Sequence, residues 1–196
     1  MTKTVRLTRP LSLRDLARRR RQTGELSMIE AAAVMAGAAL LALLAYAGGH
    51  FVMDRIHASQ FKNEAQLFHT GVLDATANDT DFSAETLTTL AQNHAFEAAG
   101  GRVATGNTGV TGLFGGAVTA APGTIETAND AMIVTYPVPA TVCSLSVAAL
   151  ANAYTMVTVN GTTIYSPSTA FNSSTAGAAC TSAGTTASIG MYTTRS

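Results

Sequence analysis

Glu30 is the residue whose surroundings most need a chemical explanation, because it stands at the start of a long uncharged run in this 196-residue chain. Residues 31–53 contain no Asp, Glu, Lys or Arg. A helix of about 20 apolar residues is long enough to cross the hydrocarbon core of a membrane. A carboxylate in the first turn of such a helix costs about 2–3 kcal/mol unless it has a partner. We therefore predict that Glu30 has a partner, the alternative being a side chain that only extends to the lipid headgroups.

Other arrangements that support catalysis or metal binding are missing from the sequence. The four histidines are never three or four residues apart, so no helical pair of metal ligands exists. The acidic segment 78–81 fits a helix-ending turn better than a calcium loop. There is no Gly-x-Ser-x-Gly motif, and the Gly-rich segment 112–116 lacks the strand-loop-helix setting of a phosphate loop. We predict no catalytic residue, metal site or cofactor, and no enzyme activity.

Basic residues are concentrated before Gly24. Eight of the twelve Lys and Arg residues precede it, with Asp15 as the one carboxylate there. The remainder of the chain has four basic and eleven acidic residues, a net charge of −7. A basic segment before an apolar helix is retained in the cytoplasm, so this pattern indicates membrane topology and gives no nucleic-acid site. Everything after Arg55 is expected to be exported.

A secretory signal peptide is the alternative reading of the N-terminus. Ala45-Tyr46-Ala47 offers a loose cleavage site, but the apolar run exceeds the 7–15 residues typical of a signal peptide.

Cys143 and Cys180 both follow the apolar run. An even number of cysteines in an exported segment favours a disulfide, which would close a Ser-, Thr- and Ala-rich loop with little apolar surface of its own. Two separate buried thiols are the alternative.

The N-terminal segment resembles the processing signal of type IV prepilins, and the residues that carry the resemblance are Gly24-Glu25-Leu26-Ser27-Met28-Ile29-Glu30 and the apolar residues after them. The resemblance implies cleavage after Gly24 by a membrane-embedded prepilin peptidase and N-methylation of Glu25. It also implies that Glu30 pairs with the N-terminal amine of a neighbouring subunit during assembly. The long leader is similar to that of the type IVb branch.

The register of cleavage departs from the family in one respect. The family places its glutamate fifth in the mature chain, whereas cleavage after Gly24 makes Glu30 the sixth residue. Cleavage between Glu25 and Leu26 would restore the spacing but would put Glu25 where the family has glycine. We favour Gly24.

Three segments are expected: a basic leader over residues 1–24, a long helix over 25–77 and a globular head over 78–196. In the second half of the helix, apolar residues recur at steps of three and four and predict a buried stripe, formed by Phe61, Ala65, Phe68, Val72 and Ala75. The head is expected to begin with a short helix capped by Ser83 and ended by Gly100-Gly101.

Short strands are predicted in the rest of the head, over 117–120, 123–128, 131–136 and 188–193, with Pro137 and Pro139 ending the sheet. A helix is predicted over 141–153. Asn160-Gly161 between 156–159 and 162–165 is the strongest hairpin signal, and 166–186 reads as low-complexity loop. The fold class is α+β, an arrangement similar to PilS-like pilins of thin conjugative pili, including the step Leu113-Phe114-Gly115-Gly116.

This resemblance implies a structural subunit that polymerises through its N-terminal helix into an extracellular pilus for cell contact, adhesion or conjugation. The expected partners are copies of the chain itself, the prepilin peptidase, the assembly platform in the bacterial inner membrane and the membrane before assembly. Two alternatives are a pseudopilin of a type II secretion system and a membrane-anchored binding domain that never polymerises.

Overall fold

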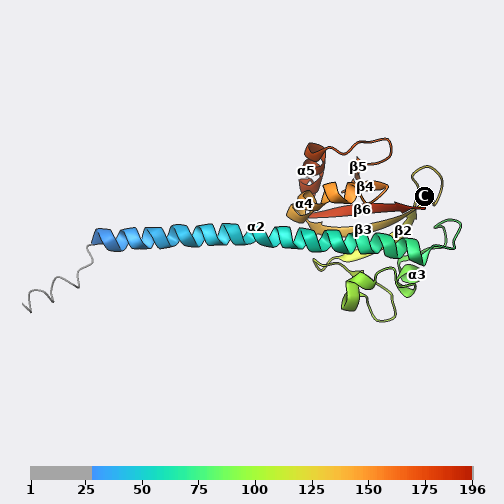
Figure 1. The fold of residues 1–196 in the computed structure, drawn as a ribbon, viewed down its shortest axis with the longest axis horizontal. Coiled ribbons are helices and arrows are strands. Elements are labelled where there is room, and N and C mark those ends of the chain that lie inside the picture. The colour runs from blue at the N-terminus through green and yellow to red at the C-terminus, as the bar shows by residue number, and fades with distance from the viewer. Residues whose placement is uncertain (1–27, 196) are drawn as a thin grey trace, which may run out of the picture. The chain divides into compact units, whose positions relative to one another are not determined.

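The computed structural model describes residues 28–195, which divide into two compact units at His50/Phe51. The first unit is the beginning of helix α2, which runs from Met28 to Ala75. The second unit, Phe51–Ser196, holds the rest of α2 and the sheet domain, which we call the head (Figure 1). Among the described residues, one helix is long and apolar enough to span a membrane.

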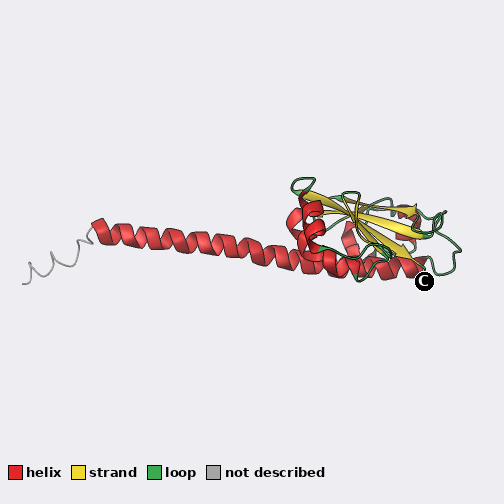
Figure 2. Ribbon diagram, turned by 90° about the horizontal axis from the view of Figure 1, so that it is seen from above, coloured by secondary structure: helices red, strands yellow, loops and turns green. Residues whose placement is uncertain are grey.

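The head is built on a six-stranded antiparallel sheet with the order β1-β2-β3-β6-β4-β5. The sheet is antiparallel throughout and helices lie beside it, so the α+β class is confirmed (Figure 2). Their bounds are α3 Leu87–Gln92, η1 Glu97–Arg102, β1 Val110–Thr111, β2 Ala117–Gly123, β3 Ala131–Pro139, α4 Ala140–Ala151, β4 Met156–Val159, β5 Thr162–Tyr165, α5 Ser173–Thr181 and β6 Thr186–Thr194.

The predicted stripe on α2 forms one wall of the core. Phe61, Ala65, Phe68 and Val72 are completely buried, and Phe61 and Phe68 contact the ring of Tyr136 on β3. The side chains of β3 that face this core alternate with half-buried ones on the other face, as expected for a sheet covered by helices on one side. The stripe prediction is therefore confirmed.

The hairpin prediction at Asn160-Gly161 is also confirmed. Val159 pairs with Thr162, which leaves a two-residue loop, and both loop residues have positive φ, 50° and 81°. Positive φ at both central positions is what a type I′ turn requires.

The prediction that Pro137 and Pro139 end the sheet is wrong. Strand β3 continues through both prolines, paired with β6 to Thr186. The N–H of Ala140 donates to Thr185 O at 2.9 Å, so the even-numbered N–H groups of this segment point toward β6. The prolines occupy the alternate positions, which point toward β2, and the pairing of β2 with β3 has already ended at Thr135. No ladder hydrogen bond is lost.

Four smaller expectations are corrected by the structure. Residues 124–130 form a loop and not a strand, and 166–186 contains helix α5. Thr86, not Ser83, caps α3, because its Oγ1 accepts from the N–H of Thr89. The glycines at 100 and 101 lie inside η1, where Gly100 has a φ of 54°.

Candidate functional site

The processing residues Gly24 and Glu25 lie outside the described residues. Glu30 lies in the first turn of α2, but its side chain is also outside what is described. The structure therefore places the backbone of Glu30 at the start of the helix and leaves its partner as a prediction.

The surface that follows Glu30 is apolar on every side. In the segment 31–53 the large apolar side chains are exposed, at 51–73% of their full area, and they comprise Val34, Met35, Leu40, Leu41, Leu43, Leu44, Tyr46, Phe51, Val52 and Met53. A helix that is hydrophobic all round is stable only when lipid or protein covers it. The first half of α2 is therefore compatible with a membrane anchor or an association surface.

A partly buried ion pair joins α2 to η1. Glu64 on α2 is 6% exposed, and its carboxylate accepts from both terminal nitrogens of Arg102, one of them at 3.1 Å. The hydroxyl of Tyr136 donates to Glu64 Oε1 at 2.8 Å and accepts from the N–H of Leu113 at 2.5 Å. Arg102 also donates to Thr111 O at 2.9 Å. Arg102 and Tyr136, which are far from Glu64 in sequence, thus meet at its carboxylate.

The ionisation states of this cluster follow from its contacts. Burial raises the pKa of Tyr136 well above its ordinary value, so the phenol keeps its proton and remains a donor. The hydrogen bond to Glu64 raises the pKa of Arg102. The sequence did not predict this cluster. Glu64 lies outside the apolar stripe, and its partner Arg102 is 38 positions away.

A second polar contact joins α2 to β6. Nδ1 of His69 lies 2.9 Å from Oγ1 of Thr193, and the imidazole contacts the ring of Tyr154 edge-on at 4.9 Å. Tyr154 donates its hydroxyl to Ala65 O at 2.5 Å. Desolvation lowers the pKa of His69, since burial disfavours the imidazolium.

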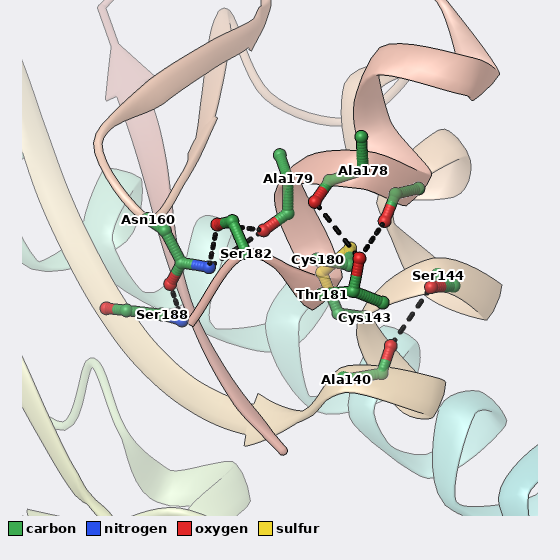
Figure 3. Close-up of a disulfide and its surroundings, with 11 residues drawn as sticks. Ala140, Cys143, Ser144, Asn160, Ala178, Ala179, Cys180, Thr181, Ser182 and Ser188 are labelled. Carbon is green, nitrogen blue, oxygen red and sulfur yellow. Dashed lines mark hydrogen bonds between the residues drawn. A yellow bond between two sulfur atoms is a disulfide. The ribbon is translucent and has the colours of Figure 1, made fainter. Parts of the chain in front are cut away.

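Cys143 and Cys180 are joined, so the disulfide prediction is confirmed (Figure 3). Cys143 lies on α4 and Cys180 on α5, with their Cα atoms 5.7 Å apart. The expectation of an apolar-poor loop between them is wrong. The enclosed segment supplies β4, β5 and part of α4, and several of its side chains are buried in the core, among them Val147, Leu150, Tyr154, Val157, Val159 and Ile164.

Asn160 connects the hairpin turn to the disulfide region. Its Nδ2 donates to Ala179 O at 2.8 Å, and its Oδ1 accepts from the N–H of Ser188 at 2.8 Å (Figure 3). One turn residue thus positions the end of α5, next to Cys180, against β6. The sequence predicts the turn at Asn160. The contacts of its side chain with α5 and β6 depend on the packed structure.

Comparison with known proteins assigns the head. The family model described as PilS N terminal matches residues 60–193, more than half of the 196-residue chain. The chain therefore belongs to the PilS family, and the predicted similarity to PilS-like pilins is confirmed. This family is one of structural pilin subunits and not of enzymes.

Among solved structures, the chain is similar to a type IV b pilin from Salmonella typhi, with 20% identity and a TM-score of 0.49, covering 67% of this chain and 98% of that chain. No curated protein matches the chain. The family match begins at residue 60, so it is independent of the motif around Gly24 and Glu30.

Proposed function

We propose that the chain is the precursor of a type IVb pilus subunit, which a prepilin peptidase cleaves after Gly24 and which then polymerises through α2 into an extracellular filament. The observation that carries this proposal is the exposed apolar surface of residues 31–53, joined in one helix to a pilin head. Before assembly, this segment spans the inner membrane with the basic leader in the cytoplasm.

Polymerisation exchanges lipid contacts of this helix for contacts with other copies of the same helix. Because the two environments have similar polarity, helix packing and polar pairs decide the association. The partner of Glu30 is the N-terminal ammonium of a neighbouring subunit, since each charge is unfavourable alone in an apolar bundle. The pair also sets the axial position of an incoming subunit. The resulting filament serves cell contact, adhesion or conjugation.

The test is Glu30→Gln. The amide is polar and nearly the same size as the carboxylate but carries no charge, so we expect normal cleavage, folding and membrane insertion. The neighbour's ammonium is left unpaired in the bundle, at a cost of about 3–5 kcal/mol, and few or no filaments should form. Electron microscopy and immunoblots of sheared surface material measure the filament yield. Glu126→Gln, which changes an exposed carboxylate of the head, is the matched control and should give normal filaments.

Wild-type filament yield from Glu30→Gln would mean that its carboxylate only marks the membrane interface. The assembly role would then be withdrawn.

A further inference from the structure

The head has two basic side chains that it does not neutralise itself. Of its four Lys and Arg residues, Arg102 pairs with Glu64 and Arg195 with Asp79. Arg55 and Lys62 have no ion pair with any carboxylate in the part of the chain that the structure describes. They are seven residues apart on α2 and therefore share one side of the helix. We call this pair the basic flank.

A groove lies on another side of the same helix, between α2 and the segment that joins α3 to η1. Its volume is about 520 Å³, and its lining includes Leu67, Asp74, His94, Glu97 and Ala98. Leu67 is 58% exposed although it is a large apolar side chain in the head. The lining contains two carboxylates and no Lys or Arg. The exposed imidazole of His94 lies 2.8 Å from Glu97, while Asp74 has no ion-pair partner among residues 28–195.

The positions of the two surfaces suit repeated association. Lys62 and Asp74 are twelve residues apart on one helix, which corresponds to about 18 Å along the axis and about 120° around it. A contact between two different patches of identical subunits is heterologous, and it generates an open filament when the rotation between subunits does not close a ring.

We propose that the groove binds the basic flank of a second copy of this chain. The aliphatic stem of the neighbour's Lys62 packs on Leu67 and Ala98, and its ammonium lies between Asp74 and Glu97, as a long side chain with an apolar stem and charged end allows. Arg55 of the same neighbour lies beside this contact and adds to the attraction. The contact rests on the filament-forming function proposed above, and it fixes the rotation of neighbouring heads, a role separate from that of Glu30.

Charge reversal tests the contact. Lys62→Glu places a carboxylate against the acidic groove, and Asp74→Lys places an ammonium against the basic flank. Like charges in contact are strongly unfavourable, so each single variant should lower the yield of sheared filaments at least about tenfold. The double variant in one chain restores opposite charges and should return the yield to near the wild-type level. Co-expression of the two single variants should do the same, because alternating subunits again bring opposite charges together.

Two controls separate this contact from other effects. Glu126→Lys alters the net charge as much as Asp74→Lys does, but at an exposed position outside the groove, and should leave the yield unchanged. All the substituted side chains are outside the core, so immunoblots should show normal amounts of membrane-bound subunit.

Single reversals that leave filament yield unchanged, or a double variant that fails to recover, would overturn the contact. If Lys62→Glu instead releases the subunit from the membrane, the basic flank binds anionic lipid headgroups. This result would also overturn the proposed contact between subunits. If the wild-type protein forms no filaments at all, the proposed function is wrong. If wild-type filaments are normal and their yield is unchanged by the reversals, only the contact is wrong.

Discussion

The carboxylate of Glu64 is buried, so its charge depends on hydrogen bonds from neighbouring side chains. Arg102→Met removes the cation while keeping an unbranched apolar stem. The carboxylate of Glu64 then retains the hydroxyl of Tyr136 as its donor. We expect the free energy of unfolding to fall by about 2–4 kcal/mol, because an unpaired buried charge is costly. The partial solvent exposure of Arg102 limits the loss. Urea denaturation of the detergent-solubilised protein, followed by tyrosine fluorescence, measures the change.

The matched control is Arg55→Met, which removes an exposed guanidinium on α2 and should change stability by less than about 0.5 kcal/mol. Equal losses from the two variants would show that the pair with Glu64 contributes nothing specific.

His69 gives the head a dependence on pH. Its pKa is lowered from the ordinary value of 6.5 by burial, so the folded state binds fewer protons than the unfolded state. The stability from this residue is complete above pH 6.5 and is lost as the pH falls from there to the folded pKa. Denaturation series between pH 8 and 5 should show this decline in wild type and a smaller one in His69→Gln. An unchanged decline in the variant would assign the effect to other groups.

Among the elements, α5 depends most on its cross-link. It is a short helix rich in Ser, Thr and Ala, and it buries only Ala176, Ala179 and Cys180. Replacing both cysteines by serine should lower the free energy of unfolding by about 2–5 kcal/mol. Limited proteolysis should then cut first within 166–186. Reduced and alkylated wild-type protein is the internal control and should behave like the variant; if both resist protease as oxidised wild type does, packing alone holds α5.

At the scale of the whole molecule, processing separates the alternatives. We expect cleavage after Gly24 to leave a mature chain that begins at methylated Glu25, and mass spectrometry would identify this N-terminus directly. Gly24→Val should leave an uncleaved precursor in the membrane, because the peptidase requires a small residue before the cut. A mature chain beginning at Leu26 would shift the register, and one beginning near His50 would indicate a signal peptide. An uncleaved wild-type chain would favour the membrane-anchored domain.

A pseudopilin of a secretion system would be cleaved in the same way as a pilus subunit, so processing does not distinguish these two. Membership of the PilS family and the disulfide favour the pilus subunit. The presence of long surface filaments built from this chain would identify a pilus subunit, and their absence would favour a pseudopilin.

The features that the sequence by itself determined are those with a local period or a local turn. The uncharged run 31–53, the stripe from Phe61 to Ala75 and the Asn160-Gly161 hairpin each depend on neighbours within about seven positions, where backbone geometry dictates which side chains share a face. The two cysteines could be paired because the chain contains no others.

Tertiary structure alone decided the contacts between distant segments. The insertion of β6 between β3 and β4, the continuation of β3 through Pro137 and the pairing of Glu64 with Arg102 depend on which strand or loop lies alongside. The local sequence around a proline or a carboxylate is the same whether the residue faces water or another segment of the protein. Only the packed structure shows which of these neighbours it has. The groove beside Leu67 is of the same kind, because its two walls are separate segments that the folded head brings together.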